Sequence, residues 1–226
     1  MLKFYYSLAP NPMKVALFLE EAGLDFEAIP VDTRKGDQFA PDFAALNPNN
    51  KVPVIVDGDV TVFDSNAILL YLAEKTGTFL PEPTPVLRGE LLSWLLFVAS
   101  GVGPYAGQCV HFRHFAPEPK DYPVQRYLFE AKRHFGILNT RLADREFMVG
   151  TAYGIVDMAL WGWVRMVPFV LGEDAWAELP HLKRHFDRVS ARPAAQRAIA
   201  IKDRHAFKSE MDDDARRVMF RHIQAA

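Results

Sequence analysis

The stretch that decides the fold runs Asn49-Asn50-Lys51-Val52-Pro53-Val54-Ile55-Val56-Asp57-Gly58-Asp59-Val60-Thr61-Val62-Phe63-Asp64-Ser65-Asn66. Two β-branched segments flank an Asp-Gly turn, which is a strong short-range signal for a β-hairpin. Asp64 and Ser65 then open an apolar run and have side chains typical of a helix N-cap. The stretch predicts strand, turn, strand and helix, with a proline close to the helix N-terminus. Because a helix N-terminus offers unpaired amide donors, this arrangement suits a small anionic ligand.

Residues 1–80 predict an α/β unit around this hairpin. Residues 2–6 and 25–31 have strand patterns, and a helix between them begins near Asn11-Pro12, which fit the N-cap and first helical positions. A polar loop over residues 32–42 precedes the hairpin, and the helix over residues 65–76 ends at Gly77. The predicted order is βαβ, loop, ββα.

Prolines crowd residues 81–86, which predicts a linker before an all-helical domain over residues 87–226. Helical patterns cover residues 87–100, 122–142, 155–170 and 179–191, with short helices from Pro193 and over 215–223. Gly101-Val102-Gly103-Pro104 should break or kink the chain between the first two. Gly154 takes the N-cap position before Asp157, so Gly154→Ser should be neutral or slightly stabilising.

The composition excludes several function classes. Half of the 226 residues are hydrophobic and the net charge is −2, so nothing predicts binding to nucleic acid or to an anionic membrane. No uninterrupted apolar run reaches the ~18 residues that a membrane helix needs, and the N-terminus has no signal-peptide pattern. The single cysteine, Cys109, excludes an intrachain disulfide and is expected to be a buried thiol without a chemical role. We expect a cytoplasmic protein.

Taken together, the hairpin with its valine-proline start, Asp64-Ser65 and the helical second half resemble the cytosolic glutathione S-transferases over nearly the whole chain. Several stretches are similar to the nu-class (disulfide-reductase-like) branch, namely Val31-Asp32 with residues 35–39, residues 47–53, residues 67–77, and Gly103-Pro104 with Gly107-Gln108 and His111-Phe112. The resemblance implies a thioredoxin-like first domain, an all-α second domain, glutathione as co-substrate without a metal, and a homodimer.

The resemblance also implies that the reactive sulfur belongs to glutathione. Thioredoxin-like redox enzymes carry Cys-X-X-Cys on the first helix, and residues 7–12 contain no sulfur. Lowering the thiol pKa by two units needs about 2.7 kcal/mol, of which a helix dipole supplies only about 0.3–1 kcal/mol. A hydrogen bond to the thiolate adds about 1.5–3 kcal/mol. The candidate donors are Asn11, Ser7 and the backbone amides of residues 9–11.

The nu-class pattern has threonine where this chain has Ala9, and the missing hydroxyl weakens the case for disulfide reduction and favours Asn11 among these donors. The alternative is that Asn11 serves only as a helix N-cap.

For glutathione binding the resemblance implies Gln38, Lys51, Val52, Pro53, Asp64, Ser65 and Arg133. Ser65 would bind the γ-glutamyl carboxylate and Asp64 the ammonium group, and Val52 would pair its backbone with the ligand beside a cis Pro53. Lys51 and Gln38 would meet the glycyl end, and Arg133 would reach the ligand across the dimer. Capping and solvated charges are the alternatives.

The pocket for an apolar co-substrate could be lined by Tyr105 and Phe112, and also by Trp161 and Trp163, although core or dimer packing better fits both tryptophans. The histidine pairs His111/His114 and His181/His185 have helical ligand spacing, but no motif completes a zinc site.

The leading hypothesis is a transferase that adds glutathione to a small electrophile. The alternatives are a glutathione-dependent disulfide reductase and a non-catalytic glutathione-binding module.

Overall fold

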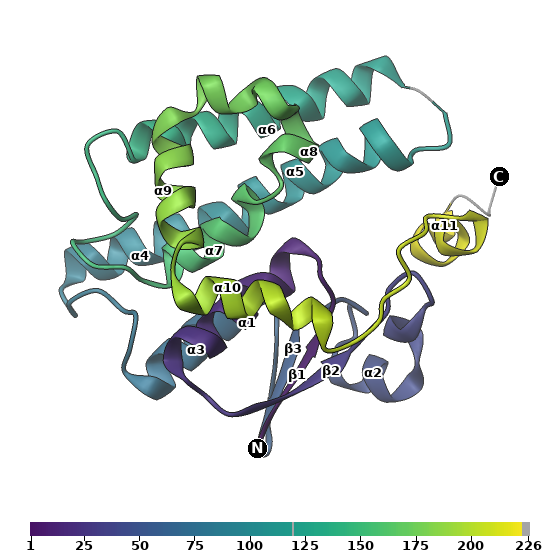
Figure 1. The fold of residues 1–226 in the computed structure, drawn as a ribbon, viewed down its shortest axis with the longest axis horizontal. Helices are drawn as coiled ribbons and strands as arrows, with labels where there is room; N and C mark the ends of the chain where they lie inside the picture. Colours follow the sequence, from purple (N-terminus) through teal and green to yellow (C-terminus); the bar gives the residue numbers. More distant parts are fainter. Residues whose placement is uncertain (119, 223–226) are drawn as a thin grey trace.

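The computed structural model describes residues 1–118 and 120–222, in which a four-stranded sheet with its helices lies below a bundle of helices (Figure 1). The sheet part comprises β1 (Leu2–Tyr6), α1 (Pro10–Ala22), β2 (Phe26–Pro30), α2 (Pro41–Leu46), β3 (Val54–Asp57), β4 (Val60–Phe63) and α3 (Ser65–Thr76). The bundle and the C-terminal segment comprise α4 (Pro85–Phe97), α5 (Gly103–Val110), α6 (Asp121–Arg141), α7 (Ile155–Val164), α8 (Val167–Leu171), α9 (Pro180–Ser190), α10 (Pro193–Ala200) and α11 (Asp213–Met219).

The sheet has the order β2-β1-β3-β4, with β1 parallel to β2 and β3 antiparallel to both β1 and β4. The Asp57-Gly58 turn joins β3 to β4 as the sequence predicts, and Gly58 adopts a φ of 61° there. α1 and α3 bury one face of the sheet in the main core, whereas Phe43 of α2 packs with Val31 and Val54. The predicted thioredoxin-like arrangement is confirmed.

The start of α1 differs from the prediction. The helix begins at Pro10, with Ala9 as an N-cap that makes no side-chain capping bond. Pro10 has no N–H group to satisfy and its fixed φ suits the first helical position, so the helix starts without a polar cap. Asn11 is therefore not the N-cap, and its side chain is available for other contacts.

Of the predicted break or kink at residues 101–104, the break is wrong, although the regular α-helix is interrupted close to this point. Val98–Val102 forms a π-helical turn that joins α4 to α5, so that one helical run extends over Pro85–Phe115. Pro104 lies in the first turn of α5, a position at which a proline is tolerated. Gly101 is needed for packing, because a Cβ there would lie 2.6 Å from Nε2 of His134.

This helical run also contains an 18-residue window with a mean hydropathy of 1.4, so by length and composition it could cross a membrane. This was not predicted from the sequence, because the prediction considered only uninterrupted apolar runs. Core helices of soluble proteins pass the same test. Leu91, Leu95, Val98 and Cys109 of the run lie in the common core.

α7 lies at the centre of the molecule, and all of its residues from Ile155 to Val164 are buried. It packs against α1 of the sheet part, which joins the two parts through a shared core. The helix begins after Gly154, as predicted, and the backbone N–H of Gly154 donates to Oδ2 of Asp157 at 2.9 Å.

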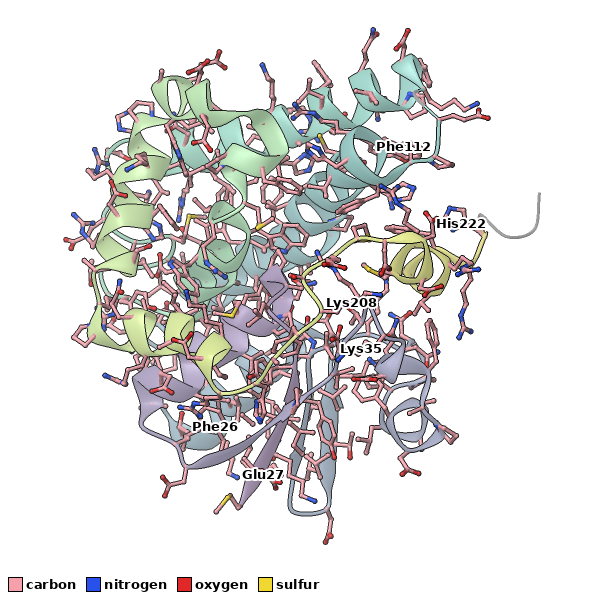
Figure 2. The ribbon with its side chains drawn as sticks, turned by 45° about the vertical axis from the view of Figure 1, so that its right-hand side comes forward. Phe26, Glu27, Lys35, Phe112, Lys208 and His222 are labelled. Atoms are coloured by element: carbon pink, nitrogen blue, oxygen red, sulfur yellow. The ribbon has the colours of Figure 1, made fainter. Side chains whose placement is uncertain are left out.

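The C-terminal segment returns to the sheet part. α10 packs against α1, and the following chain runs down beside the sheet before rising to α11, with Lys208 on its course (Figures 1 and 2). The hydroxyl of Tyr6 donates to the carbonyl of Ile201 at 3.2 Å, and the N–H of Lys208 donates to Oδ2 of Asp32 at 2.7 Å. α11 starts after the N-cap Asp212 and ends at Met219, and the predicted end of this helix at Ile223 lies outside the described residues.

Candidate functional site

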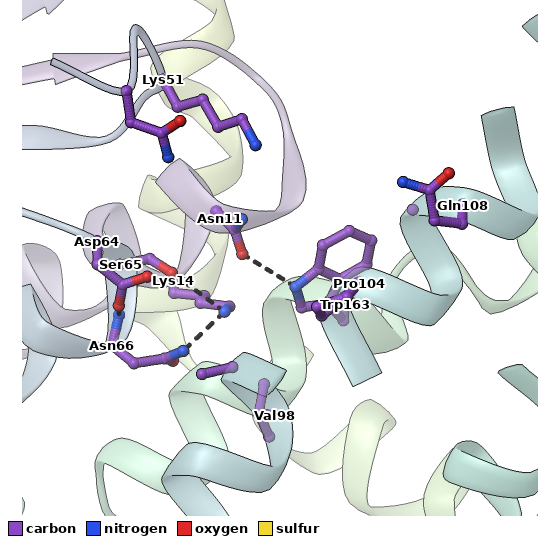
Figure 3. A pocket seen from close by; sticks show the side chains of 14 residues that line it. Asn11, Lys14, Lys51, Asp64, Ser65, Asn66, Val98, Pro104, Gln108 and Trp163 are labelled. Atoms are coloured by element: carbon purple, nitrogen blue, oxygen red, sulfur yellow. Dashed lines mark hydrogen bonds between the residues drawn. The ribbon is translucent and has the colours of Figure 1, made fainter. Parts of the chain in front are cut away.

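A cleft of about 400 Å³ lies between the sheet part and the helical bundle (Figure 3). Polar side chains form its sheet-side wall, and the π turn and α5 form much of the other. Its lining residues are Asn11, Lys14, Asn49, Lys51, Asp64, Ser65, Asn66, Val98, Ala99, Gly103, Pro104, Gly107, Gln108 and Trp163.

Asn11 projects from the first turn of α1 into the cleft, where Nε1 of Trp163 donates to its Oδ1 at 2.9 Å (Figure 3). An indole N–H can only donate, so it holds the amide oxygen and leaves the two Nδ2 hydrogens for a ligand. Gly103 makes room for the indole, because a Cβ there would lie 3.0 Å from Nε1 of Trp163. The bond therefore gives the Asn11 amide one orientation.

Lys14 lies one helical turn further along α1 and is 1% exposed. Its Nζ donates to Oγ of Ser65 at 3.2 Å and to Oδ1 of Asn66 at 3.4 Å (Figure 3). Burial lowers the pKa of Lys14 to about 7, and the charge of Asp64 partly offsets this. Gly162 of α7 leaves the space for its stem, since a Cβ there would lie 2.6 Å from Cγ of Lys14.

The N-terminus of α3 forms the end of the cleft above Lys14. Oδ1 of Asp64 accepts hydrogen bonds from the N–H groups of Asn66 at 2.9 Å and Ala67 at 3.1 Å. Asp64 is thus a helix cap, the alternative that its sequence allowed, and it is exposed at the cleft. A carboxylate has two oxygens and several lone pairs, so capping is compatible with a contact to a ligand ammonium.

The loop before β3 forms the rim opposite α5. The Val52–Pro53 peptide bond is cis, as the resemblance implies. Nδ2 of Asn47 donates to the carbonyl of Lys51 at 2.7 Å, which shapes the loop, and the Lys51 side chain is exposed at the cleft rim.

Other residues singled out in the sequence lie outside the cleft lining. Ser7 is buried and its Oγ accepts from the N–H of Ala9 at 3.4 Å. Gln38 is also buried, and its Nε2 donates to the carbonyl of Thr33 at 3.1 Å. Arg133 lies on α6 and forms an ion pair with Glu130 at 2.9 Å.

Tyr105 and Phe112 also lie away from the cleft lining. The Tyr105 ring packs on His134 with centroids 4.7 Å apart, and the Phe112 ring stacks on Tyr127 at 5.4 Å. Figure 2 shows Phe112 high in the helical part. Their place beside the cleft is taken by the smaller or more polar Pro104, Gly107 and Gln108.

Sequence reasoning missed Lys14, Asn66 and Gln108, and it did not foresee the contact of Trp163 with Asn11. A signal existed for Lys14: residues 12–19 are otherwise apolar, and all eight are buried in the structure. A lysine within such a run is either a helix flank or a buried charge with a partner. The sequence offered no comparable signal for the partner of Asn11.

Within residues 1–118 and 120–222 no three His, Cys, Asp or Glu side chains group as metal ligands. His185 of the pair His181/His185 bonds through Nε2 to Oδ1 of Asp157 at 2.8 Å. His114 of the other pair stacks on Phe169. Cys109 is buried, and burial raises the pKa of its thiol, so it is a poor nucleophile.

Comparison with known families places this site in context. The chain matches the family "Glutathione S-transferase, N-terminal domain" over residues 2–74 and "Glutathione S-transferase, C-terminal domain" over residues 104–193. The chain belongs to the glutathione S-transferase family. The two matched ranges correspond to the sheet part and to the body of the helical bundle.

Individual members of the glutathione S-transferase family are similar along most of the chain. The disulfide-bond oxidoreductase YfcG of Escherichia coli is 41% identical over 213 residues, which cover 88% of this chain and 94% of that protein. A glutathione transferase of Pseudomonas putida, solved with one glutathione disulfide per subunit, has a TM-score of 0.82 and 36% identity over 88% of this chain and 91% of that one. A family member from Pseudomonas fluorescens, solved with two glutathiones, has a TM-score of 0.81 and 36% identity over 88% and 92%.

Proposed function

We propose that this glutathione S-transferase binds glutathione in the cleft and stabilises its thiolate against the Nδ2 hydrogens of Asn11. The observation that carries the proposal is the bond from Trp163 to Oδ1 of Asn11, which turns the donor end of the amide toward the cleft. A hydrogen bond to a charged group contributes about 1.5–3 kcal/mol, enough to lower a thiol pKa by one to two units. Ala9 has no hydroxyl, so Asn11 is the side-chain donor in the first turn of α1 that lines the cleft.

The remaining glutathione contacts follow from the lining of the cleft. Ser65 and the N-terminal amides of α3 suit the γ-glutamyl carboxylate, and Asp64 suits the ammonium group. Val52 and cis Pro53 do not line the cleft themselves but directly follow Lys51 at its rim, where the backbone of Val52 suits the cysteinyl group and Lys51 suits the glycyl carboxylate. Ser7 and Gln38, being buried outside the cleft lining, are weaker candidates for direct contact.

Two reactions can use the thiolate. In conjugation, the sulfur bonds to an electrophilic carbon and displaces a leaving group or adds to a double bond. In disulfide reduction, it attacks a disulfide sulfur and releases the other sulfur as thiolate, and a second glutathione then resolves the mixed disulfide.

The lining of the cleft favours disulfide reduction as the second candidate function. Eight of the lining side chains are polar or charged, and the aromatic residues Tyr105 and Phe112 are absent from the lining. Asn49 and Gln108 are the polar side chains of this set without a role toward the first glutathione, and they are placed to contact a second peptide. The relative YfcG is a disulfide-bond oxidoreductase, and the P. putida protein binds glutathione disulfide, which supports the same choice.

We further propose a cytoplasmic homodimer. The helices α4 and α6 expose large apolar side chains, among them Leu96 at 58% and Phe129 at 61%. A groove of about 540 Å³ between these helices is lined by Trp94, Arg133, Gly136, Ile137, Thr140 and Arg141. In such a dimer Arg133 could approach the ligand of the second copy.

Calorimetric titration with glutathione and with its disulfide tests the proposed function, together with the thiolate absorbance of bound glutathione as a function of pH. We expect binding of both, with the bound thiol ionising one to two pH units below free glutathione. Binding with an unchanged thiol pKa would support the non-catalytic module instead, and no binding at millimolar ligand would refute the proposal. Rates with a small electrophile and with a mixed disulfide then separate the two reactions.

A further inference from the structure

We propose that Lys14 is the buried positioning cation of the carboxylate subsite, and that it takes up a proton when a ligand carboxylate binds at Ser65 and Asn66. The inference rests on the proposed function, because it assigns a role within the same cleft. The ligand class is any compound that presents an α-amino carboxylate to the N-terminus of α3.

The first step in the argument is the position of Lys14. Lys14 lines the cleft, yet the residue is only 1% exposed. Its Nζ donates to Ser65 and to Asn66, so the third hydrogen of an ammonium group remains for a ligand. A buried lysine needs a compensating charge to stay protonated. A carboxylate entering the cleft above Ser65 would supply that charge.

The second step concerns the charged groups that face Lys14. Asp64 at the start of α3 is exposed and already caps the helix, and its charge only partly offsets the burial that lowers the pKa of Lys14 to about 7. From α7 the facing residue is Gly162, and the π turn contributes Val98 and Ala99, none of which carries charge. Lys51 on the rim across the cleft is a further cation. The protein itself therefore places little negative charge around Lys14.

The third step links the proton to the geometry of the neighbouring groups. A neutral amine can accept the hydroxyl hydrogen of Ser65, whereas an ammonium group can only donate. Protonation of Lys14 thus turns the Ser65 hydroxyl toward the cleft as a donor. Oδ1 of Asn66 accepts from Lys14 in either state, which leaves its Nδ2 hydrogens pointing elsewhere. Proton uptake therefore converts this end of the cleft into a set of donors suited to a carboxylate.

Calorimetry with S-methylglutathione tests this role, because the ligand has the same carboxylates but no thiol to ionise. Titrations at pH 7.5 in two buffers of different ionisation enthalpy give the number of protons taken up. We expect the wild-type protein to take up about three-quarters of a proton more than Lys14→Met. Between pH 7.5 and pH 8.5 its affinity should fall about eightfold more than that of Lys14→Met, because deprotonation of the ligand's amine weakens binding to both proteins alike. Any proton taken up by the ligand's own amine is the same in both proteins, so the difference belongs to Lys14.

The matched control is Lys132→Met, which removes an exposed lysine from α6 outside the cleft and should keep the wild-type proton uptake. Wild-type binding without a buffer-dependent enthalpy would overturn the role of Lys14, whether or not the Lys14→Met protein folds. Proton uptake that persists in Lys14→Met would assign it to another group and would also refute the inference. Absence of S-methylglutathione binding to the wild type would instead count against the proposed function itself.

Discussion

At the scale of single residues, Trp163 and Lys14 orient the polar side chains of the cleft. Trp163 holds the oxygen of Asn11, and Lys14 holds the oxygens of Ser65 and Asn66. Each contact crosses between elements distant in the chain, and Trp163 is separated from Asn11 by 152 positions. The orientation of the cleft donors is thus a property of the tertiary structure.

The first prediction concerns Asn11. We expect Asn11→Ala to lower turnover at least tenfold with little change in glutathione affinity, because the lost hydrogen bond acts on the thiolate. Trp163→Phe keeps most of the packing but removes the indole N–H, and should lower turnover about fivefold by freeing the amide to rotate. Steady-state kinetics and calorimetry measure both effects. Wild-type turnover in Asn11→Ala would remove this residue from the mechanism.

The second prediction concerns the pH dependence that Lys14 gives to the stability of the protein. Its folded pKa of about 7 lies below the unfolded value near 10.5, so between these limits the unfolded chain binds more protons than the native one. The free energy of unfolding should therefore rise by about 2 kcal/mol when the pH is raised from 7 to 9. Returning the protein to pH 7 should reverse this change. Denaturant titrations of the ligand-free protein should show this rise for the wild type and for Lys132→Met but not for Lys14→Met. Parallel curves for all three proteins would contradict it.

At the scale of elements, the sequence predicted correctly what local patterns determine. The hairpin around Asp57-Gly58 and the helix over residues 65–76 follow from turn chemistry, capping and periodicity. It failed where distant groups decide the role of a glycine. Gly101 and Gly103 suggested a break or kink, but the chain stays helical there, and glycine is required because His134 and Trp163 occupy the space beside these positions.

Gly154 provides the third prediction and corrects an expectation from the sequence. A Cβ at this position would lie 2.9 Å from the carbonyl oxygen of Phe79, which accepts the N–H of Ile155 at 3.1 Å. Gly154→Ser should therefore destabilise the protein by about 1–3 kcal/mol rather than leave it unchanged. Gly89→Ala is the control, because its Cβ would meet nothing in α4, and it should stabilise by about 0.5–1 kcal/mol. Denaturant titration distinguishes the two, and equal effects would refute the steric explanation.

At the scale of the whole molecule, α4 and α6 expose large apolar side chains, which we expect a second protein surface to cover. The helical run Pro85–Phe115 is apolar, yet only 33% of its most apolar window is buried within one chain. The exposed large side chains on these two helices are Val86, Leu96, Tyr122 and Phe129, and exposed apolar surface is where a protein partner is expected. The sequence predicted a dimer through family resemblance alone, because composition does not reveal which apolar residues the fold leaves exposed.

The fourth prediction tests that interface. Phe129→Arg on α6 should convert the protein from dimer to monomer, because it places a charge among the exposed apolar groups. Phe169→Arg on α8 changes another exposed aromatic residue and should leave the dimer intact. Light scattering after size-exclusion chromatography measures the mass. A wild-type protein that runs as a monomer at micromolar concentration would contradict the predicted assembly.

The return of the C-terminal segment to the sheet has a consequence for how the chain can be divided. Residues 1–80, expressed alone, would leave the hydroxyl of Tyr6 and the carboxylate of Asp32 without the backbone groups of Ile201 and Lys208 that they bind. Truncating the chain after Ala200 would remove the same two hydrogen bonds from an otherwise intact protein. We therefore expect the sheet part not to fold on its own, and both halves to melt together in one cooperative transition.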